Sequence, residues 1–216
     1  MKKIGLFTLL FLSSITYGQK SIYFSTPLPS PDNSVDHVDL KHYGQYQSTV
    51  GNMTYTFSES GITITSTTIS SISRETIRES SKFDVRGDYL FGVAENDSVP
   101  CVLEGERYYF GVRNHQKIIN SESENVLTRI SSGVYMINFY EGGNYMPAKL
   151  TVKNKKANIA HFDYESDTED FDFILEQKSI EMSYFDLLIL KPSADEVKTL
   201  MKTDAFSDIS ELIKIE

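Results

Sequence analysis

Hydrophobic and polar side chains alternate along most of the chain between Val38 and Leu190. Met53, Tyr55 and Phe57, for example, alternate with threonine and serine. Because successive side chains of a strand point to opposite faces of a sheet, this period of two predicts strands with one buried face. Turn residues interrupt the pattern about every 8–12 positions, which is typical of all-β folds. The sequence therefore predicts an all-β domain over residues 38–190: an antiparallel meander of about ten strands, forming a barrel or a two-sheet sandwich.

Short glycine turns join several of the predicted strands. Gly61 follows the strand at 53–58, and Gly142-Gly143 separates a strand at 134–140 from one at 145–152. Glycine accepts the positive φ angles of tight hairpin turns, so these pairs are predicted hairpins. The last predicted strands are 171–175 and 184–190. The second is apolar on both faces, which favours a central position in the sheet.

The flanks of this domain differ from it in pattern. Residues 19–37 contain Pro27, Pro29 and Pro31 among polar residues, which predicts an extended lead-in outside the core. Residues 191–216 change to a helical period, and the spacing of Ser193 and Glu196 is that of a capping box. We expect a helix there, followed by a second short helix around 206–213; the alternative is that this second segment ends as a strand. Together they form a C-terminal tail packed on the sheet.

The first eighteen residues have the layout of a secretory signal peptide. Lys2 and Lys3 precede an apolar run from Ile4 to Ile15, and the small residue Gly18 marks the expected cleavage point. The run is shorter than the roughly 20 residues that span a bilayer. No cysteine follows it, so a lipoprotein is not expected. The sequence predicts a secreted or periplasmic protein, with no membrane insertion after cleavage.

Composition narrows the class of partner. The 216-residue chain has 21 Lys and Arg against 30 Asp and Glu, for a net charge of -9. An acidic chain is a poor match for nucleic acid or for anionic lipid, which both require clustered cations.

Cys101 is the one cysteine, so no disulfide can form within the chain. Its apolar surroundings predict a buried thiol in a strand.

One strand offers a candidate ligand site. Arg107, Tyr109 and Arg113 fall on one face of a strand at period two. Planar guanidinium groups beside a phenol suit an anionic or sugar ligand. The alternative is an exposed sheet face whose charges form surface ion pairs.

Motifs of the common hydrolases, nucleotide-binding loops and zinc sites are absent from the sequence, so no catalytic residue is assigned.

An acidic segment offers a candidate cation site. Asp163, Glu165, Asp167 and Glu169 occupy alternate positions, and calcium favours several carboxylate oxygens gathered on a loop. The spacing does not fit an EF-hand, because the turn glycine is missing. The alternative is a solvated acidic loop. No cofactor other than calcium is expected.

Three classes of function follow from these features. The architecture is similar to lipocalin-like barrels, with Gly44-Gln45-Tyr46 near the first strand, although those barrels usually carry tryptophan where Tyr46 stands. This similarity implies an exported, non-catalytic module that binds a small molecule or sugar in a cavity. The first alternative is a structural or assembly protein that contacts other envelope proteins. The second is an extracytoplasmic hydrolase.

Overall fold

The computed structural model describes residues 19–94, 97–163, 168–181 and 185–215, and strands make up 59% of the structure. The described strands are β1 (Gln19–Phe24), β2 (Gly44–Ser48), β3 (Met53–Ser58), β4 (Gly61–Ser73), β5 (Asp84–Arg86), β6 (Tyr89–Ala94), β7 (Asp97–Glu104), β8 (Arg107–Ile119), β9 (Val126–Ser131), β10 (Val134–Glu141), β11 (Asn144–Lys153), β12 (Lys156–Phe162), β13 (Gln177–Glu181), β14 (Phe185–Leu190) and β15 (Phe206–Lys214). The described helices are α1 (Arg74–Glu79) and α2 (Ala194–Leu200), with short 3-10 turns η1 (Pro31–Asn33), η2 (Leu40–His42) and η3 (Thr168–Phe171).

The predicted all-β fold with a short C-terminal helix is confirmed, with more strands than the ten expected. The strands follow the order β13-β14-β1-β11-β12-β15-β2-β3-β4-β8-β7-β6-β5, and β10 and β9 branch from β11. The sheet is mixed, because β1 pairs parallel to β14, and it does not close. The closed barrel among the two predicted forms is therefore wrong. None of the described helices is long and apolar enough to cross a membrane.

The body of the molecule contains two hydrophobic clusters on opposite faces of β10. Tyr135 and Ile137 point into a cluster that includes Tyr46, Phe57 and Leu150. Met136, between them in sequence, points into a second cluster that β1, β14 and α2 complete. Because neighbouring side chains of a strand face opposite ways, three consecutive buried residues require cover on both faces. The centre of the body is thus filled with side chains rather than hollow.

The proline-rich lead-in differs from the prediction. Ile22, Phe24 and Leu28 are at most 1% exposed and belong to the second cluster, so this segment is part of the core. The Leu28 backbone N–H donates to Asn138 Oδ1 at 2.8 Å, and Asn138 Nδ2 donates to the Leu28 carbonyl at 3.0 Å. A buried asparagine therefore holds the segment against β10. The prolines mark only the bends that follow β1.

Two segments near the C-terminus are corrected. The helix expected at 206–213 is wrong, because these residues form β15 between β12 and β2. The strand expected at 171–175 is also wrong: η3 ends at Phe171, and Phe171 and Ile174 pack into the second cluster. The capping box is confirmed, since the Ser193 side chain accepts from the Glu196 N–H and the Glu196 side chain accepts from the Ser193 N–H.

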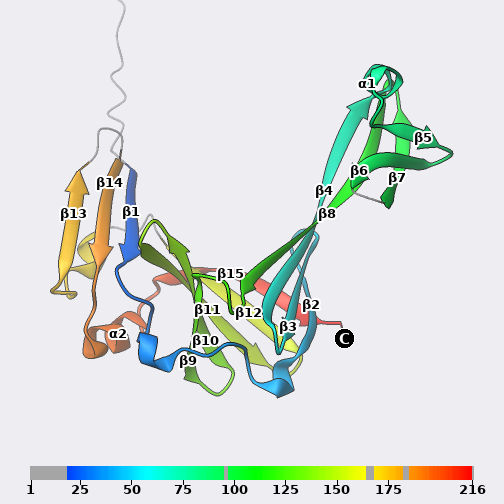
Figure 1. Cartoon of the computed structure of the whole chain (residues 1–216). Coiled ribbons are helices and arrows are strands. Elements are labelled where there is room, and N and C mark those ends of the chain that lie inside the picture. Colours follow the sequence, from blue (N-terminus) through cyan, green and yellow to red (C-terminus); the bar gives the residue numbers. More distant parts are fainter. Residues whose placement is uncertain (1–18, 95–96, 164–167, 182–184, 216) are drawn as a thin grey trace, which may run out of the picture.

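A long arm projects from the body (Figure 1). The 13-residue strands β4 and β8 pair along their length and carry α1, β5, β6 and β7 at the far end. We call residues 61–119 the arm and residues 74–106 its distal lobe. Leu90 and Cys101 are buried in the lobe, which confirms the buried thiol. Burial, and then the charge of Asp88, raises the pKa of Cys101.

Candidate functional site: a basic pocket at one end of the body

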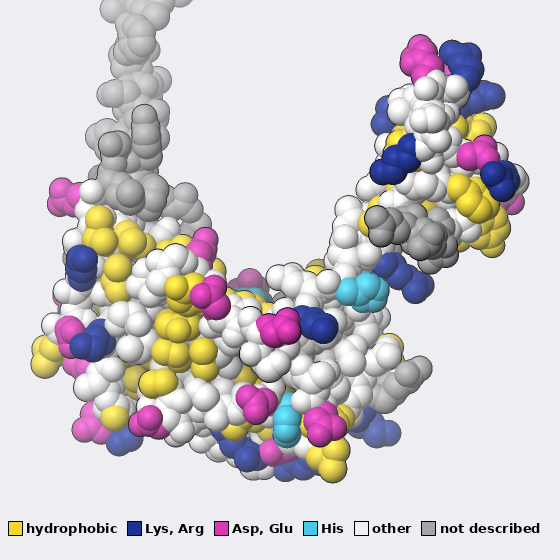
Figure 2. Space-filling model, in the orientation of Figure 1, with side chains coloured by type: hydrophobic (Ala, Val, Ile, Leu, Met, Phe, Trp, Pro, Cys, Tyr) yellow, Lys and Arg dark blue, Asp and Glu magenta, His cyan; other side chains and the backbone are white. Residues whose placement is uncertain are grey.

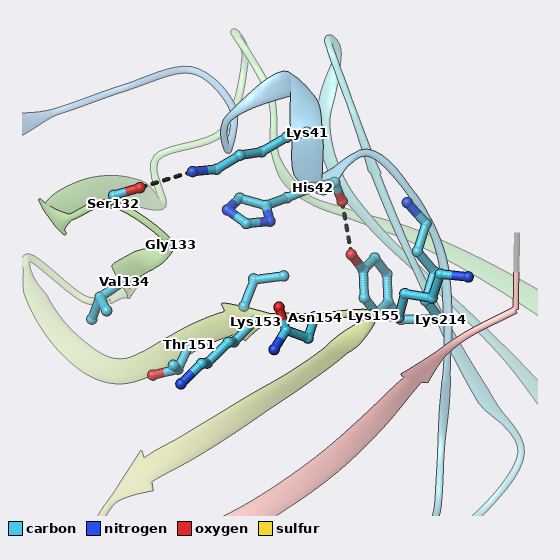
Figure 3. Close-up of a pocket in the computed structure, with 12 residues that line it drawn as sticks. Lys41, His42, Ser132, Gly133, Val134, Thr151, Lys153, Asn154, Lys155 and Lys214 are labelled. Carbon is cyan, nitrogen blue, oxygen red and sulfur yellow. Dashed lines mark hydrogen bonds between the residues drawn. The ribbon is translucent and has the colours of Figure 1, made fainter.

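A cavity of about 510 Å³ lies where several connections of the body meet (Figure 3). Its walls are η2, the start of β2, the β9–β10 turn, the β11–β12 turn and the end of β15. These pieces are distant in sequence, and the strand pairing brings them together: the Lys214 N–H donates to the Lys155 carbonyl, and the Val152 N–H donates to the Gly133 carbonyl. The lining comprises Lys41, His42, Tyr46, Ser132, Gly133, Val134, Thr151, Val152, Lys153, Asn154, Lys155 and Lys214.

The lining is basic, although the chain as a whole carries a net charge of -9. Four lysines contribute to it, and no aspartate or glutamate does. Among the described residues, Lys153, Lys155 and Lys214 form no ion pair; Lys41 lies 3.9 Å from Asp39. Four ammonium groups around one cavity repel each other unless an anion lies between them. The pocket is therefore a place where negative charge is favoured.

Two of the lysines are held in place by the protein. Lys41 Nζ donates to Ser132 Oγ at 2.8 Å, across the mouth of the β9–β10 turn. Lys214 Nζ donates to the Tyr43 carbonyl and lies 5.7 Å from the centre of the Tyr46 ring. The hydroxyl of Tyr46 in turn donates to the His42 carbonyl at 3.0 Å. These contacts fix one side of the pocket, whereas Lys153 and Lys155 extend from an exposed turn.

That turn has an uncommon backbone. Asn154 and Lys155 both adopt positive φ, at 51° and 65°. Positive φ at both central residues of a two-residue hairpin turn is the type I′ arrangement, which usually selects asparagine and glycine. Lysine is a poor residue for this conformation, so its presence at position 155 is not explained by the turn alone. It does place one of the four ammonium groups on the rim.

His42 lies at the centre of the pocket, between Lys41 and the β11–β12 turn in Figure 3. Its Nε2 atom is buried and has no hydrogen-bond partner in the structure. Burial of the ring, together with the nearby charge of Lys41, lowers the pKa of His42. The lowered pKa favours the neutral imidazole, in which one ring nitrogen donates and the other accepts a hydrogen bond.

Gly133 provides the room for this ring. Its φ is 74°, and a Cβ atom there would lie 2.6 Å from the Val152 carbonyl oxygen and 3.4 Å from His42 Nε2. Asp39, next to the pocket, pairs with Arg129 and lies 3.9 Å from Lys41, and its N–H donates to the Tyr135 hydroxyl at 2.9 Å. Burial opposes ionisation of Asp39, but the Arg129 guanidinium outweighs it and the pKa of Asp39 is lowered.

The chemistry of the lining suits a small polar anion. Ammonium groups bind phosphate, sulfate and carboxylate as point charges, and the neutral side chains of Ser132, Thr151 and Asn154 supply further donors and acceptors. Apolar lining is limited to Val134, Val152 and the ring of Tyr46. The arrangement therefore fits a hydrophilic anion better than the apolar ligand of a barrel interior.

The residues predicted as a ligand site lie elsewhere. Arg107, Tyr109 and Arg113 are exposed on β8 in the arm, and they do share one face of the strand. They are not part of the basic pocket. Arg107 Nε donates to Ser71 Oγ at 3.0 Å and forms no described ion pair, so this face is not neutralised in the way that the alternative interpretation expects.

The predicted calcium residues are only partly described. Glu165 and Asp167 lie outside the described residues, as does the side chain of Glu169. Asp163 lines a second cavity of about 490 Å³ with Asp170 and Asp204. In the part of the chain that the structure describes, no group of three or more carboxylate, histidine or cysteine ligands gathers around one point. Calcium binding stays a prediction.

Sequence reasoning missed the basic pocket. Its one local signal is the run from Lys153 to Lys156, which contains three lysines in an acidic chain. Lys41, His42 and Lys214 carry no local signal, because only the pairing of β15 with β12 and β2 brings Lys214 near η2.

Comparisons with protein-family models, curated proteins and solved structures found nothing that matches this chain. Its function must therefore be inferred from the geometry of the site.

Proposed function

We propose that this protein is an exported binding module that holds a small anionic ligand in the basic pocket. Export rests on the signal-peptide layout of residues 1–18, which lie outside the described residues. Binding rests on one observation: four lysines line a cavity of about 510 Å³ without a carboxylate among them, in a chain of net charge -9. The ligand class is a hydrophilic molecule with phosphate, sulfate or carboxylate groups.

The arrangement supports binding more than catalysis. A hydrolase needs a base or nucleophile aligned with a partner that orients it. His42 Nε2 has no such partner, and the lining holds no carboxylate or cysteine. The hydroxyl of Ser132 accepts from Lys41 rather than facing the imidazole. The lysines instead provide charge, which determines affinity and the choice of ligand.

Titration calorimetry on the mature chain tests this proposal, with inorganic phosphate, sulfate and citrate as probes. The variant carries Lys153→Gln and Lys155→Asn, since asparagine accepts positive φ and keeps the turn. Loss of two charge-assisted contacts is expected to weaken binding at least about tenfold. The control carries Lys178→Gln and Lys202→Gln, two exposed lysines outside the pocket, and should bind as the parent does.

Two outcomes would contradict the proposal. One is the absence of heat, and of any rise in melting temperature, with all three anions at millimolar concentration, because a ligand that binds the folded state must stabilise it. The other is an equal loss of affinity in the control variant, which would indicate general ion association with the protein surface. Both variants change exposed side chains, so circular dichroism should show an unchanged fold.

A further inference from the structure

One face of the arm carries a row of cations. In the antiparallel pair β4–β8, directly opposite residues place their side chains on the same face. The register between Ser73↔Arg107 and Thr63↔Lys117 is unbroken. Every second residue of β8 therefore lies on one face, opposite serine, threonine and isoleucine of β4. We call this the cationic face; its β8 residues are Arg107, Tyr109, Gly111, Arg113, His115 and Lys117.

The cations of this face are not neutralised. Strands β4 and β8 contain Arg107, Arg113 and Lys117 but no aspartate or glutamate. None of these three takes part in an ion pair within the described residues. Glu104 of β7 is opposite Arg107 in the register, yet Arg107 instead contacts Ser71 through Nε at 3.0 Å and Nη2 at 3.3 Å. By the same register, Glu104 shares this face beside Arg107 but forms no ion pair with it among the described residues, so the face carries three cations against one carboxylate in an acidic protein.

An apolar platform separates the two arginines. Tyr109 is 39% exposed, Val102 of β7 is opposite it in the register and 70% exposed, and Ile69 of β4 is 75% exposed. Ile69 is opposite Gly111, which has no side chain to cover it. Exposed apolar residues on three adjacent strands form a contiguous patch of the kind that marks a contact surface. The patch lies between guanidinium groups on either side.

The dimensions of this face are those of a linear ligand. Alternate residues of a strand are about 7 Å apart, and Arg107 and Lys117 are separated by about 34 Å along β8. The arm projects from the body, so the ligand can pass along it without meeting the body except at its root (Figure 1). Figure 2 shows acidic side chains interspersed with lysine and arginine over the body, whereas β4 and β8 contain no acidic residue.

We propose that the cationic face binds a linear acidic polysaccharide. Its carboxylate or sulfate groups would pair with Arg107, Arg113 and Lys117, and one sugar ring would lie on the platform of Tyr109, Val102 and Ile69. The serine and threonine hydroxyls of β4 suit the hydroxyls of a sugar, since each both donates and accepts. Single-stranded nucleic acid is a poorer fit, because its binders stack successive bases on several aromatic residues, and Tyr109 is the one tyrosine or phenylalanine among the β4 and β8 residues of this face. The pocket and this face share no residue, so this inference does not depend on the proposed function.

The test measures binding of the mature chain to polygalacturonate and to dextran sulfate, with neutral dextran as the uncharged probe. One variant combines Arg107→Gln with Arg113→Gln, and a second carries Tyr109→Ala. The control combines Arg78→Gln and Lys82→Gln, which removes the same charge from exposed positions of the distal lobe off this face. Affinity is measured over a range of salt concentrations.

The parent is expected to bind at least one of the two polyanions at low salt and not neutral dextran. The double arginine variant should bind at least about tenfold more weakly and with a shallower salt dependence, because fewer counterions are released. Tyr109→Ala should weaken binding while leaving the salt dependence unchanged, which simple ion exchange would not produce. The control should behave as the parent.

Three results would overturn the proposal: no binding of either polyanion at low salt, an equal loss in the control variant, or binding of a single-stranded oligonucleotide as tight as that of the polysaccharides. The altered residues are exposed, so the variants are expected to fold. An unchanged circular dichroism spectrum and melting curve would verify this before the affinities are compared.

Discussion

The body and the arm are built from the same kind of strand but are stabilised differently. In the body, the strands around β10 are covered on both faces, and two clusters of buried side chains link segments from Ile22 to Leu212. In the arm, β4 and β8 have one largely exposed face, and the distal lobe buries few large side chains, of which Leu90 is completely covered. Pairing of β4 with β8 produces an extended ribbon. Burial of both faces of the body strands removes more apolar surface from water and therefore stabilises the body more.

This difference bears on function. The basic pocket lies at one end of the body, where hydrogen bonds hold Lys41 and Lys214. The cationic face lies on a projecting ribbon with unpaired charges. A preorganised pocket suits one small ligand, and an exposed ribbon suits a long one. The two proposed anion-binding surfaces therefore differ in shape.

The largest expected effect comes from the two cores. Leu150→Ala in the body and Leu90→Ala in the distal lobe both truncate a leucine that is 0% exposed. Leu150→Ala is expected to lower the free energy of global unfolding by about 2–5 kcal/mol. Leu90→Ala should instead open the distal lobe alone. Hydrogen exchange followed by mass spectrometry distinguishes the two, and loss of protection in body peptides of Leu90→Ala would show that arm and body unfold as one unit.

A smaller effect is expected at the pocket itself. Gly133→Ala places a Cβ atom 2.6 Å from the Val152 carbonyl at a φ of 74°. The clash and the strained backbone should cost about 1–3 kcal/mol and displace His42. Gly142→Ala is the matched control, because its φ is also positive at 57° but nothing lies within 4 Å of the added atom. If thermal melting shows the same loss of stability in both variants, the whole effect comes from the positive φ angle and none comes from packing against β11.

The smallest effect is a dependence on pH. The pKa of His42 is lowered in the folded state, so the unfolded chain binds a proton more readily. Stability contributed by neutral His42 is therefore present above the unfolded pKa of about 6.5 and is lost as pH falls below it. The carboxylate of Asp39, whose pKa is also lowered, loses its contribution only at more acidic pH.

We expect the melting temperature to fall between pH 7.5 and pH 5.5, and to fall less in His42→Gln. The control is His115→Gln on the exposed face of the arm, which should keep the parent's slope. Parallel slopes for His42→Gln and the parent would show that another group causes the dependence.

Much of the fold was predictable from local pattern. Alternation at Met53, Tyr55 and Phe57 and the glycine pair at Gly142-Gly143 indicate hairpins, because the side-chain period and the turn conformation are properties of neighbouring residues. The capping box at Ser193 is local for the same reason. The spacing of Ile209, Leu212 and Ile213 fits a helix as well as a strand. The segment forms a strand because it pairs with β12 on one side and with β2 on the other.

The candidate sites divide in the same way. The acidic balance, the all-β class and the shared face of Arg107, Tyr109 and Arg113 can be read from local pattern, since they depend on composition and on the period of single strands. Tertiary structure alone decided that the sheet stays open, that β4 and β8 project as an arm, and that Lys41, His42, Lys153 and Lys214 surround one cavity. These arrangements could not be read from local pattern because they depend on which strands pair across long separations in sequence. That choice is made by the burial and hydrogen bonding of the whole chain rather than by any one segment.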